Sequence, residues 1–413
     1  MRNFAPQMEK DMQSYRLSDL VKIKNGKDHK MLSNGKYPVL GSGGIMRYVD
    51  KFLYDKPSVL LPRKGTLDNI QYCDVPFWTV DTLYYTEVNT NLANPYYLYR
   101  YLSLLDLSNL DSGTGVPSMT FDNYYGLKIF LPNIEKQTKI AQILQTLDKK
   151  IIINRQINQN LEAMAKQLYD YWFVQFDFPN EDGKPYKSSD GEMVWNEKLK
   201  REIPNGWKDI TLNAYIDKNK GGDWGYDTPK EGTIKVGCVR GADIVKLNDV
   251  PTRHITLKHY DRLLEDGDIV IEISGGSPVQ ATGRVALITK GVIERNGGAL
   301  VCSNFCQSFS MKKRVFSEYF YYLWQSLYDN NNMFNFEGKT SGIKNFQTDV
   351  FLANHWFEVP EQLILKFHDI VQEYHSQIDQ NIIENNYLTK QRDELLPLLM
   401  NGQVSVISDL SDD

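Results

Sequence analysis

IAQILQTLDKKIIINRQINQNLEAMAKQLYDYW (140–172) sets the architecture of this chain, because its pattern occurs twice. The second copy is FHDIVQEYHSQIDQNIIENNYLTKQRDELLPLL (367–399). In the first stretch, positions taken in alternating steps of four and three residues are mainly apolar. Such steps form the heptad seam of a helix that packs against another helix. The same seam recurs in the second stretch without a gap, starting with Ile140 matched to Phe367. The sequence therefore predicts two copies of one long helix.

Polar residues interrupt both seams at the same two steps. Asn154 and Asn158 in the first helix correspond to Asn381 and Asn385 in the second. Two such helices can bury each other's seams by packing antiparallel. We expect the asparagines to fix the register by hydrogen bonding across the pair or to linker backbone, and the alternative is that they face solvent. The predicted seam residues are Leu144, Leu147, Ile151, Asn154, Asn158, Leu161, Val371, Tyr374, Ile378, Asn381, Asn385 and Leu388.

Proline and glycine residues mark the ends of both predicted helices. Pro132 and Pro360 lie just upstream, where the fixed φ angle and missing N–H of proline are tolerated. Pro179 is expected to end the first helix, and Gly402 the second. Pro397 falls within the last turns of the second helix, so we expect a kink or frayed turns there.

A stretch of short strands and turns precedes each helix. Both stretches hold a strand with a glycine turn, a second apolar strand and a short aromatic helix. They are SVLLPRKG (58–65), FWTVDTLYYT (77–86) and NPYYLYRYLSLL (94–105) in the first copy, and DIVIEISGGSP (268–278), ALVCSNFCQSFS (299–310) and SEYFYYLWQSL (317–327) in the second. This pattern predicts an α+β fold, with two mixed α/β regions in pseudo-twofold repeat joined by two long antiparallel coiled-coil helices.

The predicted organisation divides the chain into segments of different character. They are an N-terminal leader (1–14), the first globular region (15–131), the first helix (132–179), a linker (180–206), the second globular region (207–359), the second helix (360–402) and a C-terminal tail (403–413). The linker is polar and rich in turn residues, without helical or strand periodicity.

Acidic residues are concentrated near the C-terminal end. The chain carries 47 lysines and arginines against 52 aspartates and glutamates, but residues 359–413 hold 3 against 10. The rest of the chain has a small positive balance, so nucleic acid is compatible with it, while phosphates would repel the acidic C-terminal stretch. Charge alone favours the simpler interpretation that a near-neutral region binds nothing charged. The outer face of the second helix, with Glu373, Glu384 and Glu394, is expected to meet protein.

Other features exclude several classes of protein and of site. Four cysteines cannot form a disulfide framework in a chain of this length, which favours a cytoplasmic location. Cys302 and Cys306 are spaced like metal ligands, but no second pair of Cys or His lies nearby, so we expect no metal site. No apolar run reaches the ~18 residues of a membrane-spanning helix, and no secretory leader is visible.

One motif suggests catalysis. NPYY (94–97) resembles the Asn-Pro-Pro-Tyr signature of adenine-N6 methyltransferases. However, Asn is also a strong helix cap and proline suits a first helical turn. The second copy has FSEY (316–319) at this point, with Ser317 as the expected cap. The glycine-rich turn for S-adenosylmethionine and the HExxH and GxSxG motifs are missing. We expect no catalytic residue, and a stand-alone adenine-N6 DNA methyltransferase remains an alternative.

The plan of two globular regions, each followed by a copy of one long helix, resembles that of type I restriction-modification specificity subunits. FDFPN (176–180), GKPY (183–186) and IPNGW (203–207) resemble the family's central conserved region and the entry to its second target-recognition domain. LP (131–132) with Gln137, and VPEQ (359–362), resemble the motif at which the family's long helices begin. LE (161–162) with WF (172–173) resembles the far end of such a helix. The resemblance extends from about Tyr15 to Val404.

The resemblance implies a DNA-recognition subunit with no catalysis and no bound cofactor of its own. Each target-recognition domain would read one half of a bipartite, asymmetric target in double-stranded DNA, and the helices would set the spacing. Two methylation subunits would dock on the chain and two motor-nuclease subunits would join them, so S-adenosylmethionine, ATP and Mg²⁺ would belong to the partners. A scaffold that uses its coiled coil only to bind other proteins is a second alternative.

Candidate DNA-binding residues flank the glycine turns of both globular regions. Bare glycine backbone lets a DNA strand approach closely, although simple hairpin turns explain the glycines equally well. Arg and Lys suit guanine edges or phosphates, Gln suits adenine and Ser suits either, whereas each of these residues is more often solvated surface. The candidates are Ser42, Gly43, Arg47, Arg63 and Lys64 in the first region, and Ser274, Ser277, Gln280, Arg284, Lys339 and Lys344 in the second.

Overall fold

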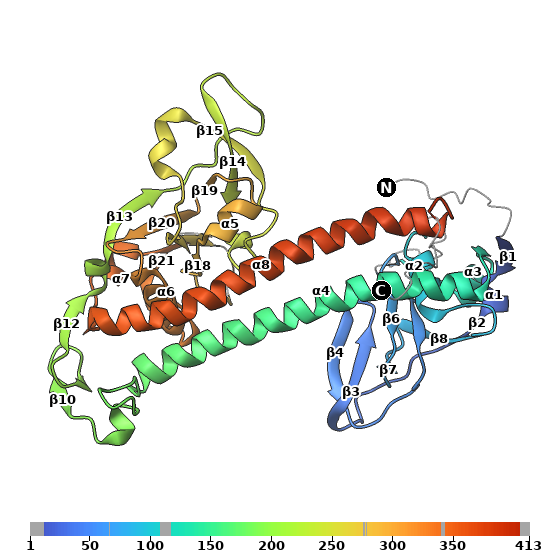
Figure 1. Cartoon of the computed structure of the whole chain (residues 1–413), viewed down its shortest axis with the longest axis horizontal. Helices are drawn as coiled ribbons and strands as arrows, with labels where there is room; N and C mark the ends of the chain where they lie inside the picture. Colours follow the sequence, from blue (N-terminus) through green and yellow to red (C-terminus); the bar gives the residue numbers. More distant parts are fainter. Residues whose placement is uncertain are drawn as a thin grey trace, which may run out of the picture. The chain divides into compact units, whose positions relative to one another are not determined.

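The computed structural model describes residues 12–65, 67–107, 117–275, 277, 279–339 and 343–404, apart from the side chain of Lys339. The chain divides into two compact units. Unit 1 comprises Met1–Ile152 and Asn385–Asp413, and unit 2 comprises Ile153–Glu384. Both units contain part of each of two long helices, α4 (Ile134–Tyr169) and α8 (Glu361–Met400) (Figure 1).

Short strands form the globular part of unit 1. Its described elements are β1 (Gln13–Arg16), α1 (Leu17–Leu20), β2 (Val21–Lys24), β3 (Asn34–Gly41), β4 (Gly44–Val49), β5 (Ser58–Pro62), β6 (Gln71–Cys73), β7 (Trp78–Thr79), β8 (Leu83–Val88), α2 (Pro95–Leu102), α3 (Phe121–Tyr125) and β9 (Lys128–Leu131). One sheet has the order β2-β8-β5-β6 and another the order β4-β3-β7, in which β3 runs parallel to β7. Strands β1 and β9 form a separate antiparallel pair.

The globular part of unit 2 is larger. Its described elements are η2 (Asp170–Val174), η3 (Lys187–Ser189), β10 (Met193–Asn196), β11 (Arg201–Pro204), β12 (Lys208–Thr211), η4 (Leu212–Tyr215), β13 (Ile216–Gly221), β14 (Thr233–Val239), η5 (Gly241–Asp243), β15 (Thr252–Thr256), η6 (Leu257–Arg262), β16 (Ile269–Glu272), β17 (Ser274–Gly275), β18 (Val285–Leu287), α5 (Lys290–Arg295), β19 (Leu300–Cys302), β20 (Cys306–Met311), α6 (Phe316–Asp329), η7 (Asn332–Phe336), β21 (Glu337–Lys339), β22 (Lys344–Phe346), α7 (Thr348–Leu352) and β23 (His355–Glu358).

The two globular parts repeat one strand order. The sheet β13-β20-β16-β18 of unit 2 corresponds to β2-β8-β5-β6 of unit 1, and β15-β14-β19 corresponds to β4-β3-β7. Each three-stranded sheet combines an antiparallel pair with a parallel pair, and the β12–β23 pair corresponds to β1–β9. Unit 2 adds the β10–β11 hairpin and the small sheet β17-β22-β21. The α+β class and the internal repeat are confirmed.

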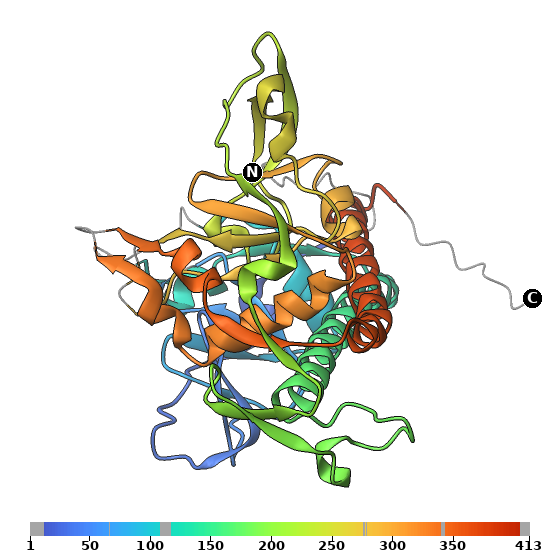
Figure 2. The same cartoon turned by 90° about the vertical axis from the view of Figure 1, so that its left-hand side faces the viewer.

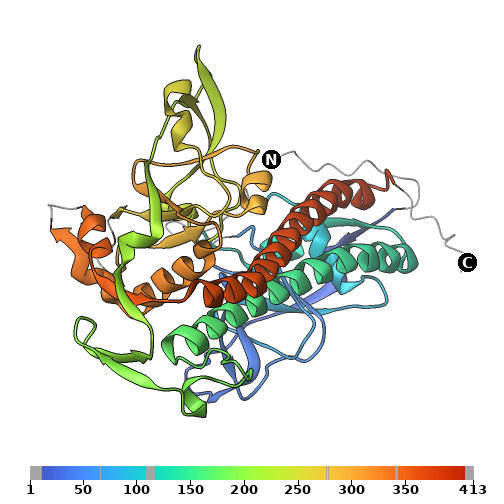
Figure 3. The same ribbon diagram turned by 60° about the vertical axis from the view of Figure 1, so that its left-hand side comes forward.

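Helices α4 and α8 pack against each other (Figure 3). Within unit 2, Asn154 Nδ2 donates to Glu384 Oε2 at 2.6 Å, and Asn381 Nδ2 donates to Asn158 Oδ1 at 2.7 Å. The residue numbers fall along α8 as they rise along α4, so this pairing is antiparallel, as predicted for the two copies.

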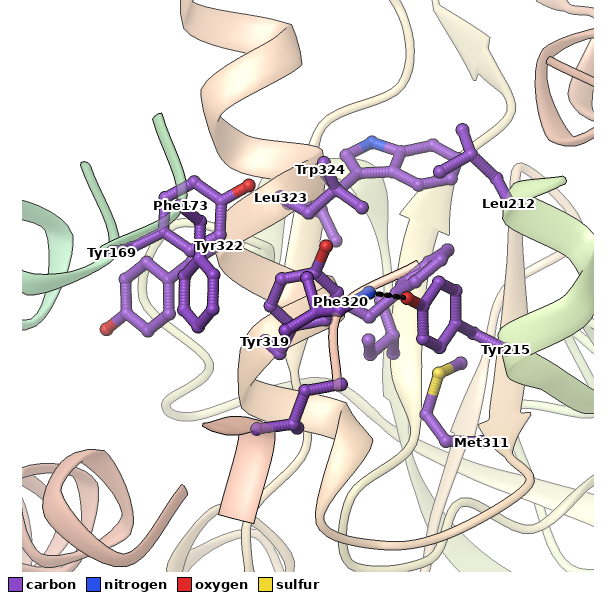
Figure 4. Close-up of a cluster of buried hydrophobic side chains, with 14 of the residues drawn as sticks. Tyr169, Phe173, Leu212, Tyr215, Met311, Tyr319, Phe320, Tyr322, Leu323 and Trp324 are labelled. Atoms are coloured by element: carbon purple, nitrogen blue, oxygen red, sulfur yellow. Dashed lines mark hydrogen bonds between the residues drawn. The ribbon is translucent and has the colours of Figure 1, made fainter. Parts of the chain in front are cut away.

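The hydrophobic core of each unit includes side chains from the long helices. In unit 1, Ile140 and Leu144 of α4 and Leu399 of α8 pack with the aromatic residues of α2. In unit 2, Tyr169 of α4 lies beside α6, where Trp324 is buried (Figure 4). Each globular part is therefore anchored to both helices by apolar packing.

The helix ends differ from the expectations in two places. The helical backbone continues through Pro397 to Met400, so the expected fraying of these turns is wrong, because a proline in the last turns removes little of the hydrogen-bond ladder. Gly402, with φ +69°, follows as expected for a helix C-terminus. The first helix stops before Pro179: after the π-helical turn η2, Phe176 takes a φ of 64° and Asp177 N donates to Tyr171 O at 2.9 Å.

Ser317 does not cap α6. The helix begins one residue earlier, at Phe316, so Ser317 lies inside its first turn and is fully buried. Glu318 forms the polar contacts at this end instead: its carboxylate accepts from Arg314 Nη1 and lies 2.8 Å from His368 Nδ1 on α8. No helix among the described residues combines the length and the apolar character needed to cross a membrane.

Candidate nucleic-acid interface

Two glycine turns of unit 1 lie together. The β3–β4 hairpin turns at Ser42 and Gly43, and the Ser42 carbonyl oxygen accepts from Asn69 Nδ2 at 2.6 Å and from Gln71 Nε2 at 3.3 Å. A Cβ added to Gly65 would lie 3.6 Å from Ser42 Oγ, whereas one added to Gly43 would meet no described atom within 4 Å. The turn is a braced hairpin tip with open space beside it.

The three predicted cations of unit 1 have different surroundings. The Arg47 guanidinium donates to two backbone carbonyl oxygens of the loop before β3, so it braces that loop. Arg63 Nη1 donates to the Asp81 carbonyl oxygen at 3.3 Å. Lys64 is exposed. The structure therefore gives Arg47 and Arg63 internal partners and leaves the Lys64 side chain at the surface.

Unit 1 also has a basic segment that is not among the residues predicted from the sequence. KIKNGKDHKMLSNGK (22–36) holds five lysines and one aspartate, and all five lysines are exposed. The segment is fixed to the three-stranded sheet, because Trp78 Nε1 donates to the Lys27 carbonyl oxygen at 2.8 Å. A local charge run is the signal that reveals it. The small net charge of the chain before its acidic C-terminal stretch does not reveal this run, because acidic residues elsewhere balance it.

Two of the three predicted cations of unit 2, Arg284 and Lys344, are paired with carboxylates. Arg284 donates from Nε and Nη2 to the two carboxylate oxygens of Glu272 at 2.8 and 2.7 Å, and this bidentate bond raises the pKa of Arg284. Lys344 Nζ lies 2.9 Å from Glu337 Oε2. Both charges are neutralised inside the domain, which weakens their case as phosphate contacts.

The remaining candidates of unit 2 lie near the small sheet β17-β22-β21. Ser274 Oγ donates to Asn345 Oδ1 at 2.6 Å, and Ser277 Oγ accepts from the backbone N–H of Gln280 at 3.2 Å. The backbone of Lys339 belongs to β21, but its side chain lies outside the described part, as does Gly276 between the two serines.

The predicted seam residues face inward along the helix pair. Leu144, Ile151, Val371, Ile378 and the four asparagines are buried, and Leu147, Leu161, Tyr374 and Leu388 are half-buried. Asn158 Nδ2 also donates to the Ile378 carbonyl oxygen at 3.3 Å. The expected outward orientation of Glu384 is wrong, because its carboxylate turns toward α4 to accept from Asn154. Glu373 and Glu394 are exposed.

The NPYY segment caps a helix and anchors it to α4. The Asn94 side chain accepts from the backbone N–H groups of Tyr96 and Tyr97, which begins α2. The Asn94 N–H itself donates to Gln137 Oε1 at 2.9 Å, and Gln137 Nε2 donates to the Leu92 carbonyl oxygen at 2.9 Å. Gln137 is fully buried, so this side chain links α2 to the start of α4. Asn94 thus has a complete structural role.

Metal chemistry finds no support in the described residues. Among them, no three His, Cys, Asp or Glu side chains are grouped to hold an ion. Cys302 and Cys306 are free and buried, and burial raises the pKa of Cys306 to about 12. Neutral, buried thiols of this kind are packing residues.

Comparisons with known proteins agree with this arrangement. Residues 9–163 match the family model described as the type I restriction modification DNA specificity domain. The type I restriction enzyme MjaIX specificity subunit of Methanocaldococcus jannaschii is 26% identical over 318 residues, which cover 75% of this chain and 68% of that protein. The HindI specificity subunit of Haemophilus influenzae is 40% identical over 101 residues, 22% of this chain and 21% of that protein.

A solved structure has the same fold. The crystal structure of the type I restriction-modification system S subunit from M. genitalium aligns with a TM-score of 0.62, covering 95% of this chain and 97% of that one at 17% identity. At this identity the likeness concerns the architecture of β-rich domains with packed long helices.

Proposed function

This chain belongs to the family of type I restriction-modification DNA specificity subunits, and we propose that each of its globular regions reads one half of a bipartite, asymmetric DNA target. The chain is the specificity component of such a system and not a catalytic one. The two readers are the target-recognition domains proposed at 15–131 and 207–359. Base contacts within them are proposed near the glycine turns and, in the first, along the basic segment 22–36.

One observation carries this proposal: the two globular parts share a strand order but differ in the elements that stand out from it. In unit 2 the β14–β15 hairpin stands out from the sheet (Figure 2), and the nearby Trp224, Tyr226 and Tyr260 are exposed. The corresponding β3–β4 hairpin of unit 1 exposes Ile45 and Met46 instead. Two readers with one scaffold and different surfaces suit two different half-sites.

We assign the spacing of the half-sites to α4 and α8. Buried asparagines at seam positions oppose a register slip, because a slip would leave their amides against apolar neighbours. A fixed register between the two helices would hold the two half-sites at a constant spacing. The half-sites are then expected about one turn of DNA apart, ~34 Å between centres.

The helices are also the proposed docking surface for two methylation subunits, with two motor-nuclease subunits joining the assembly. Exposed apolar residues of α4, among them Ile153, Ile157 and Met164, recur at heptad spacing, and the exposed Glu373 and Glu394 lie on α8. Such surfaces support protein contact. S-adenosylmethionine, ATP and Mg²⁺ would then be bound by the partner subunits.

An exchange of domains tests the proposal. Residues 15–131 are replaced by the matching domain of a related chain, and methylated adenines are mapped in DNA from cells that express the hybrid with its methylation subunits. We expect one half of the methylated sequence to change, while the other half and the spacer stay the same. A change in both halves, or a single continuous palindrome, would contradict two independent readers.

The alternatives give different results in simple assays. A coiled-coil scaffold would give no DNA footprint with the assembled complex. A stand-alone methyltransferase would transfer labelled methyl groups to DNA without partners. The capping role of Asn94 speaks against that second alternative, because the side-chain oxygen is occupied by two backbone donors.

A further inference from the structure

A hollow of about 530 Å³ in unit 2 is lined mainly by carboxamide and hydroxyl side chains. Its amides are Asn219 of β13, Gln307 of β20, Asn345 of β22 and Gln347, and Ser274 of β17 adds a hydroxyl. Asp349 is the only charged residue among the described lining residues. Small-molecule sites are lined mostly by apolar and aromatic groups. This amide groove has a different composition, one suited to a polar edge.

The amide groove forms where the core-facing side of the main sheet becomes polar. On β20, the buried Phe309 faces the core, and Gln307, two residues before it, points to the same side of the strand. Gln307 pairs with Gly221 of β13, and Asn219 lies two residues before that glycine, so the two amides are diagonal neighbours. A Cβ added to Gly221 would meet no described atom within 4 Å, so the space beside them is open.

The other side of the amide groove is formed by the small sheet. Ser274 pairs with Asn345 in the β17–β22 ladder, and the hydrogen bond of 2.6 Å between their side chains orients the Asn345 amide. Asn345 and Gln347 are exposed. The β21–β22 hairpin beside the groove stands out from the body of unit 2 (Figure 2).

The chemistry of the amide groove selects one base. A carboxamide offers a donor and an acceptor side by side, which match N7 and the N6 amino group of adenine. Guanine is read by unpaired Arg or Lys, but here Arg284 and Lys344 are held by Glu272 and Glu337. We infer that the amide groove binds the major-groove edge of an adenine in the half-site of the second recognition domain. This inference rests on the proposed function.

Base analogues test the inference in the complete methylation complex. The target is first mapped from methylated DNA, and duplexes are then made with 7-deazaadenine, which lacks the N7 acceptor, at single positions of each half-site. At one adenine of the second half-site we expect a loss of affinity of roughly 5- to 150-fold, the range of one bidentate base contact. The Asn345→Ala and Gln347→Ala variants should bind natural DNA more weakly and lose their sensitivity to that analogue.

A matched control uses Asn213→Ala, an exposed amide of unit 2 outside the amide groove, which should keep the full analogue penalty. Folding of each variant is checked by unchanged assembly and by an unchanged loss of affinity, relative to natural DNA, for analogues placed in the first half-site. The inference is overturned if no 7-deazaadenine in the second half-site weakens binding, if the penalty survives in both groove variants, or if only 7-deazaguanine is penalised. If the wild-type complex methylates no two-part target, the proposed function itself is contradicted, and the inference is contradicted with it.

Discussion

The aromatic helices α2 and α6 hold the same place in the two repeats but are joined to the long helices by different chemistry. The fully buried Tyr97 of α2 corresponds to the fully buried Tyr319 of α6, and the same alignment pairs Arg100 with Tyr322. In the alignment of the two long helices, Asp148 of α4 corresponds to His375 of α8. Unit 1 therefore uses an ion pair where unit 2 places a tyrosine beside a histidine.

Arg100 and Tyr322 are buried and Asp148 and His375 are half-buried, but the two joints differ in electrostatics. The Arg100 guanidinium and the Tyr96 hydroxyl donate to Asp148, and Arg392 of α8 adds a bond of 3.0 Å. In unit 2 the Tyr322 hydroxyl lies 3.2 Å from His375 Nε2. The two repeats share the position of the joint but not its residues, so different side chains fill the same place in the two units.

The largest difference is expected on removing one side of each joint. Asp148→Ala leaves the Arg100 guanidinium buried without its counter-charge, so the free energy of unfolding should fall by about 3–5 kcal/mol. His375→Ala removes a neutral contact and should cost about 1 kcal/mol plus lost packing. Urea unfolding measures both, and hydrogen exchange should place the first loss in α2. Equal costs would contradict the distinction.

A glycine in each repeat gives the next largest contrast. Gly291 of α5 packs on α8 so closely that an added Cβ would overlap Asp379 Cβ. Gly291→Ala should therefore cost about 1–3 kcal/mol through overpacking. Gly43→Ala at the hairpin tip of unit 1 meets open space and should stay within about 0.5 kcal/mol of the parent. Thermal unfolding of the two variants compares them, and a neutral Gly291→Ala would show that α5 is not held against α8.

The asparagine pair of unit 2 should show a smaller and reversible effect. Asn158→Leu leaves the Asn381 amide buried without that partner and should destabilise the chain by about 1–2 kcal/mol. The double variant with Asn381→Leu should recover this loss, because apolar residues suit the seam, while the spacing between methylated half-sites becomes less strict. Unfolding free energies and mapped methylation sites provide the two readouts. Unchanged spacing in the double variant would argue against a role in register.

The smallest contrast concerns pH. Burial lowers the pKa of His375, opposed by Glu318 and Asp379, so the unfolded chain binds this proton more readily. The stability from neutral His375 is present above the unfolded pKa of about 6.5 and is lost as pH falls below it. Burial would raise the pKa of Asp148, but the Tyr96 hydrogen bond and Arg100 lower it, so its stability is lost only below about pH 3.9. Between pH 7 and pH 5, hydrogen exchange corrected for the pH dependence of the intrinsic rate should rise in α6 and not in α2. His375→Gln should abolish the rise.

Candidate residues at the surface show what could not be predicted from sequence. Arg284 looked like a base reader because it follows a glycine turn, yet Glu272, 12 residues away, takes both of its donor groups. Glu384 looked like a surface charge, yet it bonds Asn154, 230 residues away. Long-range partners decide whether a charged side chain is available. The residue types near a turn carry no information about such distant partners.

The repeat, the two long helices, their pairing and the α+β class could be predicted from the sequence, because heptad spacing is a local pattern and its recurrence at a constant offset extends over many residues. Only the folded chain shows the matched strand orders, the two different joints and the amide groove. Strand pairing joins residues far apart in the chain, and a side chain becomes a binding group or a buried partner only when those neighbours are in place.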